Sequence, residues 1–209
     1  MSGDQRPRTQ AERSAETQAL LLDATIISLV ELGYARTSTT EIVRRAGVSR
    51  GAQVHHYPTK ADLVVAAVER VFGQQEQQFA ERFRSLPPGE RTVERAIELL
   101  WSIFDSPAFQ AILELVVASR TDEQLRVVVQ AVGARFEQSV ADLYAEFFPD
   151  LARTPVGSGL VGFAFAVLSG AAMSDYAGFG DPRVTVDLLK ALTGIVDPVL
   201  EALNDERHD

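Results

Sequence analysis

The 209-residue sequence contains no cysteine, which excludes disulfide scaffolds, thiolate metal sites and cysteine nucleophiles. Only three histidines are present, and two of them, His55 and His56, are adjacent. Adjacent side chains on a helix point about 100° apart, so this pair shares no face and predicts no metal site. The N-terminal segment has no apolar core of the kind that a secretion signal carries. We therefore expect a protein of a reducing compartment, the cytoplasm, without metal or other cofactor.

Signals of catalysis and of sheet structure are also missing. There is no Gly-x-Ser-x-Gly elbow, no phosphate-binding loop and no zinc-ligand spacing, and the histidines have no acidic partner at a familiar spacing. The sequence therefore predicts a protein that is not an enzyme. No segment alternates apolar and polar residues between turn signals, so no strand is predicted. The fold class that remains is all-α.

Basic charge is scarce overall, but it is unevenly distributed. The net charge is -9. Residues 1–60 hold eight Lys and Arg against six Asp and Glu, a balance of +2, whereas residues 61–209 hold twelve against twenty-three, a balance of -11. A slightly basic head on an acidic body indicates that only the head faces a polyanion.

Helix signals divide this head into short pieces. Apolar residues at a spacing near 3.6 predict a helix over 12–32, and Gly33 is expected to end it. The segment Ser38–Glu41 matches a capping box, in which the Ser38 hydroxyl and the Glu41 carboxylate each accept a hydrogen bond from the other's backbone amide. A short helix should follow and should break at Gly47.

A second short helix is predicted from Arg50 to Tyr57, with Ser49 as its cap and Pro58 as its end. The segment 59–62 is a third cap signal and opens a long helix that reaches about residue 85. Two short helices joined at a glycine, the second rich in groups that bind anions, describe a helix-turn-helix over 38–57.

In such a motif the first helix crosses the DNA backbone and the second enters the major groove. Arg50 can pair bidentately with guanine and Gln53 with adenine. Glu41 is expected to serve mainly as a cap, and His56 is as well explained by packing as by contact with DNA. The predicted DNA-binding residues are Thr39, Thr40, Arg44, Ser49, Arg50, Ala52, Gln53, His55, His56 and Lys60, of which Lys60 is expected to hold a phosphate.

The stretch "ELGYARTSTTEIVRRAGVSRGAQVHHYPTKADLV" resembles the N-terminal domain of TetR-type transcriptional regulators. The resemblance extends over residues 14–75. It implies a ligand-responsive regulator, typically a repressor, that binds a palindromic operator in double-stranded DNA as a homodimer and is released by a small-molecule effector. The chain departs from the pattern at Val54, where the family often has a phosphate-binding Tyr, and at Gln53, where an apolar residue is usual. His55 then becomes the better candidate for a phosphate contact.

The remaining chain continues as helices at about 90–105, 107–119, 122–147, 157–178 and 182–204, separated by Pro and Gly breakers. We therefore predict a three-helix DNA-binding domain over 12–75 and a larger helical bundle for ligand binding and dimerisation over 76–205. The resemblance implies an effector pocket in this bundle, and Trp101 and Phe104 are proposed to line it. The alternative to DNA binding is a helical interaction module.

No charge occurs over residues 154–174, a length that could span a membrane. Small residues recur there at every fourth position, which lets another helix approach closely, and no basic cluster or aromatic belt flanks the segment. We therefore predict a dimer interface and no membrane contact. The resemblance implies a four-helix bundle across a two-fold axis, and the predicted interface residues are Gly162, Ala166, Gly170, Leu188, Leu192, Ile195 and Val199.

Overall fold

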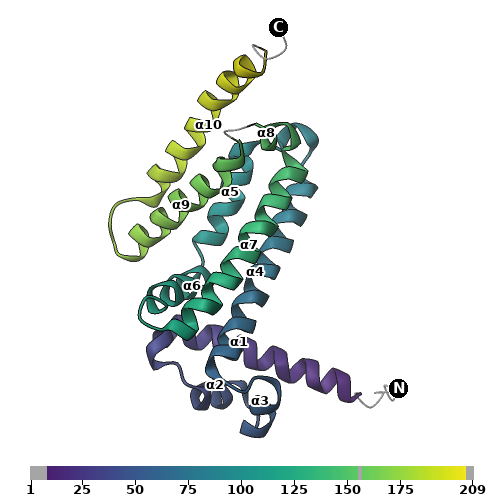
Figure 1. The fold of residues 1–209 in the computed structure, drawn as a ribbon, viewed down its shortest axis with the longest axis vertical. Coiled ribbons are helices and arrows are strands. Elements are labelled where there is room, and N and C mark those ends of the chain that lie inside the picture. Colours follow the sequence, from purple (N-terminus) through teal and green to yellow (C-terminus); the bar gives the residue numbers. More distant parts are fainter. Residues whose placement is uncertain (1–8, 155–156, 206–209) are drawn as a thin grey trace, which may run out of the picture. The chain divides into compact units, whose positions relative to one another are not determined.

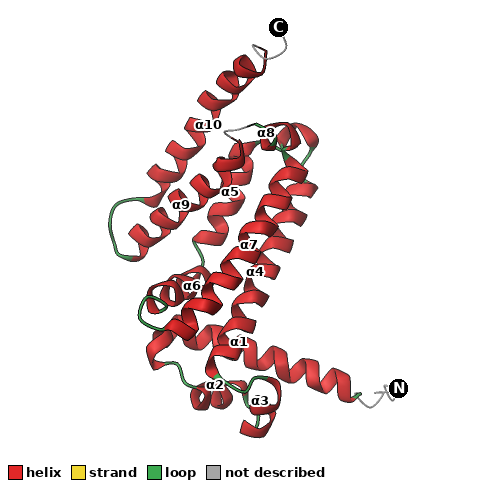
Figure 2. Cartoon of the chain, viewed as in Figure 1, coloured by secondary structure: helices red, strands yellow, loops and turns green. Residues whose placement is uncertain are grey.

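The computed structural model describes residues 9–154 and 157–205, with side chains described except at 158 and 195–205. Every regular element within these residues is helical, which confirms the all-α prediction (Figure 2). The helices are α1 Gln10–Arg36, α2 Thr39–Ala46, α3 Arg50–His56, α4 Lys60–Ser85, the 3-10 turn η1 Pro88–Glu90, α5 Val93–Phe104, α6 Pro107–Ala118, α7 Glu123–Phe147, α8 Pro149–Ala152, α9 Gly157–Tyr176 and α10 Pro182–Asp205 (Figure 1).

The first helix begins earlier and ends later than the sequence predicted. Thr9 and Glu12 form a capping box, in which the Thr9 hydroxyl accepts from the Glu12 amide at 3.2 Å and the Glu12 carboxylate accepts from the Thr9 amide at 2.7 Å. Helical geometry does break at Gly33, as predicted, because this residue has a φ of +70° that favours glycine. One further turn follows to Arg36, and α1 ends there.

The next two helices take their bounds from the predicted caps. The Ser38 hydroxyl accepts from the Glu41 amide at 3.2 Å, and the Ser49 hydroxyl accepts from the Ala52 amide at 3.1 Å. Gly47 ends α2 in the left-handed conformation, with a φ of +66°. The helix-turn-helix is therefore fixed by local interactions that the sequence displays.

The long helix α4 begins at the third predicted cap. The Thr59 amide donates to the Asp62 carboxylate at 2.9 Å, and the Asp62 amide donates to the Thr59 hydroxyl at 3.1 Å, so both halves of a capping box are present. The helix runs to Ser85, where the sequence placed its end.

The chain forms two compact units, and one of them is not contiguous in sequence. The first unit holds the residues up to Val71 together with Glu114–Val132, and the second holds Phe72–Leu113 and the residues from Gly133 on. The predicted division at residue 75 lies near the first of these boundaries. It places all of Glu114–Val132 in the other domain, because contiguous sequence signals do not show that this segment returns to pack on the first unit.

Each unit has its own apolar core. In the first unit the core contains Leu21, Ala24, Ile42, Ala46 and Leu63, drawn from α1, α2 and α4. In the second unit α5, α9 and α10 pack on one another around Trp101, Phe104 and Leu168. By length and composition alone, α1 and the segment Gly159–Tyr176 of α9 could cross a membrane. However, α9 places Leu168, Ala171 and Ala172 in the core of the second unit.

Candidate DNA-binding surface and apolar cavity

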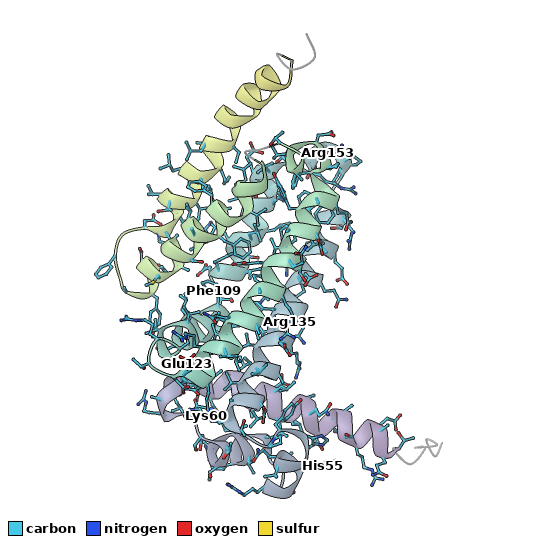
Figure 3. The ribbon with its side chains drawn as sticks, in the orientation of Figure 1. His55, Lys60, Phe109, Glu123, Arg135 and Arg153 are labelled. Atoms are coloured by element: carbon cyan, nitrogen blue, oxygen red, sulfur yellow. The ribbon has the colours of Figure 1, made fainter. Side chains whose placement is uncertain are left out.

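The outer face of α3 is the first candidate site. Its exposed residues are Arg50, Gly51, Val54 and His55, at a spacing that brings them onto one side of the helix. Figure 3 labels His55, which lies on this helix. Val54 is 47% exposed although it is apolar. This outward face can contact base edges and phosphates. It offers a guanidinium, a glycine backbone, the two methyl groups of a valine and an imidazole.

Gln53 lies on the opposite side of α3, which corrects the prediction that it reads a base. The side chain is only 1% exposed, and its amide nitrogen donates to the carbonyl of Tyr57. A buried side chain that closes the C-terminal end of its own helix cannot reach a base edge. TetR-type regulators usually have an apolar residue at this position, and that preference was the signal for a buried side chain.

His56 takes the packed position that the sequence left open as an alternative. Its Nδ1 lies 3.3 Å from the side-chain nitrogen of Gln18 on α1, and the ring is partly buried. The ring of His55 meets it edge-on, with centroids 5.0 Å apart, but stays exposed. Of the two imidazoles, His55 is thus the one that solvent and a DNA backbone can reach.

Glu41 neutralises basic charge at the end of α2. Its carboxylate accepts from Arg44 at 2.6 Å and from Arg45 at 2.6 Å, and Arg45 also pairs with Glu31 at 2.6 Å. Hydrogen bonds from Arg44 and then Arg45 lower the pKa of Glu41 to about 2. The Arg44 side chain is 69% exposed against 20% for Arg45, so Arg44 is the member of this group that can meet a phosphate.

Lys60 is partly buried and has partners within the first unit. Its ammonium donates to the carbonyl of Tyr34 at 2.5 Å and lies 3.7 Å from the centroid of the Tyr34 ring (Figure 3). Burial lowers the pKa of Lys60, and the charge of Asp122 opposes that shift. Burial and then Asp122 raise the pKa of Tyr34. The structure thus gives Lys60 internal partners, and its contact with a phosphate stays a prediction.

The remaining predicted contacts are exposed or partly buried, and one of them serves as a cap. Thr39 and Thr40 occupy the first turn of α2, with Thr40 exposed and Thr39 partly buried. Ser49 is exposed and its hydroxyl caps α3, while Ala52 is partly buried.

The second candidate site is an apolar cavity of about 140 Å³ inside the second unit. Helices α4, α5, α7, α9 and α10 contribute to its wall. Its aromatic members are Phe79, Phe136, Tyr144, Phe147, Phe148, Phe163 and Phe165. Apart from Tyr144, polar side chains in the wall come from Glu76 and Thr193. A cavity of this composition suits an apolar small molecule.

Comparison with known proteins bears on both sites. Residues 21–67 match the family model described as bacterial regulatory proteins, tetR family. An uncharacterised HTH-type transcriptional regulator of Mycobacterium tuberculosis is 35% identical over 148 residues, which cover 68% of this chain and 76% of that protein. The HTH-type transcriptional regulator CymR of Pseudomonas putida is 36% identical over 137 residues, which cover 66% and 68%. The chain belongs to the TetR family of transcriptional regulators.

Solved structures show the same fold at low sequence identity. A TetR-family regulator from Rhodococcus sp. superposes with a TM-score of 0.67 at 17% identity, over 87% of this chain and 98% of that one. A transcriptional regulator from Saccharomonospora viridis, solved in complex with choline, gives a TM-score of 0.64 at 16% identity, over 85% and 95%. At this identity the likeness shows the fold alone.

Trp101 and Phe104 do not line the cavity of this TetR-family regulator, which corrects the prediction. They are 5% and 2% exposed and belong to the packed core of the second unit. Leu100 and Ile103, each one residue earlier on α5, line the cavity instead. The rotation of α5 about its axis decides which of these neighbours faces the cavity. The sequence shows that the helix is amphipathic but not which side meets a void.

The predicted dimer surface is exposed in the single chain. Gly162, Ala166 and Gly170 lie on an open face of α9, where a Cβ on either glycine would meet no atom within 4 Å. Leu188 on α10 is 60% exposed, and Leu192 is exposed as well. Large apolar side chains that sequence reasoning missed are exposed on the same two helices and the turn between them, namely Phe163, Met173, Tyr176, Phe179 and Val184. Ile195 and Val199 lie outside the residues whose side chains are described.

Within the described residues no group of three His, Asp or Glu side chains is placed to hold a metal ion.

Proposed function

We propose that this TetR-family chain is a ligand-responsive repressor, which binds a palindromic operator as a homodimer in the cytoplasm and leaves it when a small effector binds. The observation that carries the proposal is the outward face of α3, where Arg50, Val54 and His55 are all exposed. None of these three side chains belongs to the apolar core of the first unit.

Each exposed group has a stated role in reading DNA. Arg50 opens α3, the end of a recognition helix that approaches base edges, and its guanidinium fits the two acceptors of guanine. Val54 follows one turn later and offers methyl groups to the methyl of thymine. His55 and Arg44 are assigned to phosphates, which fix the register of the protein without carrying sequence information.

Dimerisation supplies the second recognition helix. The open glycine face of α9 and the exposed leucines of α10 form an apolar surface that a second copy can cover isologously. A two-fold axis through this surface matches a palindrome, whose half-sites lie about one helical turn, roughly 34 Å, apart.

The cavity supports regulation by a small molecule. An effector can alter DNA affinity only through its different affinities for the DNA-competent and DNA-incompetent arrangements of the dimer. The choline complex of the Saccharomonospora viridis regulator supports the idea that this fold holds small molecules.

The proposal is tested by selecting duplexes from a random pool with the purified protein and then measuring affinity for the selected and scrambled duplexes. We expect enrichment of a palindrome and a tight complex with two chains per duplex. Arg153→Ala is the matched control, because this exposed arginine belongs to the second unit and should leave affinity unchanged. Failure to enrich any sequence, at low and at physiological salt, would overturn the proposed function.

A further inference from the structure

We infer that the cavity of the second unit takes an uncharged, hydrocarbon-like molecule built on a single six-membered ring with one short branch. The inference rests on the proposed function in one respect, which is that this cavity is the effector site. It adds the chemical class of the effector, on the basis of the size of the cavity, the nature of its wall and the charges around it.

The size of the cavity limits the ligand to about one ring. The volume is about 140 Å³. An apolar cavity of roughly 150 Å³ in another protein stays dry and holds benzene, so a void of this size is filled by one ring with little to spare. Long chains and fused ring systems exceed this volume and would have to extend past Phe163 and Leu192, which line the cavity and are exposed.

The wall of the cavity is made of carbon and is rich in rings. Phe136 and Phe165 meet edge to face, with centroids 5.5 Å apart, and Phe79 and Phe147 are tilted at 6.4 Å. Rings of this kind accept another ring in edge-to-face or offset geometry, which adds attraction beyond the burial of area. The wall thus favours an aromatic or compact cyclic body over a polar one.

An anionic ligand has no partner in this wall. Among the residues whose side chains are described, no Lys, Arg or His lines the cavity. The hydroxyl of Thr193 already bonds to the Lys190 carbonyl at 2.7 Å, with the Glu94 carboxylate at 3.1 Å. A carboxylate that entered would lose its water without gaining a cation, which is the costliest way to bury a polar group.

A cationic ligand meets one carboxylate, that of Glu76, which lines the cavity. Glu76 is only partly buried, and the surface that the cavity presents to a ligand is almost entirely carbon. We expect the desolvation of an ammonium in such a wall to outweigh its attraction to a carboxylate that stays in contact with water and to the aromatic rings. The neutral member of any pair of molecules of equal shape should therefore bind more tightly than the charged one.

Two pairs of isosteres test this directly, because the members of each pair differ in charge and hardly in shape. The first pair is tert-butylbenzene and phenyltrimethylammonium, and the second is nitrobenzene and benzoate. Binding to the full chain without DNA is measured by calorimetry and by the thermal unfolding midpoint. We expect each neutral compound to bind at least tenfold more tightly than its charged partner and to raise the midpoint.

Two variants tie the result to the cavity. Val140→Phe, which adds a ring at the wall, should abolish binding of tert-butylbenzene while the protein stays folded. Glu76→Gln should leave the affinity of all four compounds within about twofold of wild type. Tighter binding of phenyltrimethylammonium that Glu76→Gln removes, tighter binding of benzoate than of nitrobenzene, or no binding of either neutral compound would each overturn the inference.

The outcome is separable from that of the proposed function. If tert-butylbenzene binds in the cavity but leaves operator affinity unchanged, the ligand class is upheld and the effector role of the cavity fails. If a palindrome is selected but neither neutral compound binds, the DNA-binding proposal stands and the ligand class fails.

Discussion

The helix-turn-helix and the cavity-bearing unit are held together by different kinds of interaction. In the first, Ser38, Ser49 and Thr59 each accept a hydrogen bond from an amide three residues later, and Gly47 turns the chain between the short helices. In the second, α5, α9 and α10 meet through apolar side chains distant in sequence. Local caps thus set the bounds of the helices proposed to contact DNA, whereas long-range packing shapes the cavity proposed to hold a ligand.

The largest expected effect tests the distinction between core and cavity wall on α5. Phe104→Ala removes a ring from the packed core and should lower the free energy of unfolding by about 3–5 kcal/mol. Leu100→Ala only enlarges an existing void and should cost less, about 2–3 kcal/mol. Urea unfolding of both variants measures the difference. Equal losses would mean that Leu100 is packed as tightly as Phe104.

The next effect concerns the open face of α9. Gly162→Leu should leave the single chain intact, since no atom lies within 4 Å of the added Cβ, but it should obstruct a second copy. We expect the dimer to weaken by about 1–3 kcal/mol, the usual cost of overpacking. Sedimentation across a concentration series measures this, with Gly73→Leu on α4 as the control, where the added Cβ also meets open space. A wild-type protein that is monomeric at micromolar concentration would remove the basis of the proposed dimer.

A smaller effect is expected at Lys60, where the two kinds of role can be told apart. Lys60→Met removes the bond to the Tyr34 carbonyl and the cation–π contact, so unfolding free energy should fall by about 1 kcal/mol. The dependence of DNA affinity on salt should stay as in wild type, because no phosphate contact is lost. If the plot of log affinity against log salt concentration is instead flatter by about one unit, Lys60 contacts a phosphate as the sequence suggested.

The smallest effect is a pH dependence at Glu41. Its pKa is lowered from 4.5 to about 2 by Arg44 and Arg45, so the folded state binds a proton less readily than the unfolded state. The resulting stabilisation is present above pH 4.5 and is lost as the pH falls through about 2. Glu41→Gln should therefore reduce the loss of stability between pH 4.5 and 2, measured by thermal unfolding. An unchanged pH profile would show that the Glu41 carboxylate has the same pKa in the folded and the unfolded state.

Sequence reasoning reached those features that adjacent residues determine. The bounds of α2, α3 and α4 follow from caps and glycines that are read directly, and the resemblance to TetR-type regulators uses the same residues. Prediction from the sequence failed where a residue distant in sequence determines the position of a side chain. Gln53 has the chemistry of a base reader, but the packing of α3 turns it inward. Lys60 is basic at a helix start, but Tyr34 lies 26 residues away and captures it.

The sequence also could not show how α5 is rotated about its axis, or that Glu114–Val132 packs on the first unit. Trp101 and Phe104 were reasonable wall residues by size, yet a rotation of one residue on α5 places Leu100 and Ile103 there. The return of Glu114–Val132 to the first unit depends on contacts that no local pattern records. Val54 was noted only for lacking a phosphate contact. Its exposure, which makes it a candidate base contact, follows from the side of α3 that Gln53 anchors.

The most direct test of the central claim compares the two faces of α3 on the selected operator. Affinity for the operator and for a scrambled duplex is measured for Arg50→Ala on the outer face and for Gln53→Leu on the buried face. Arg50→Ala should lose about 1–3 kcal/mol of discrimination at one position in each half-site, because the pairing with guanine is gone. Gln53→Leu should keep the wild-type sequence preference. Undiminished discrimination in Arg50→Ala, or a loss of sequence preference in folded Gln53→Leu, would contradict the assignment of the outer face of α3 as the reader of DNA.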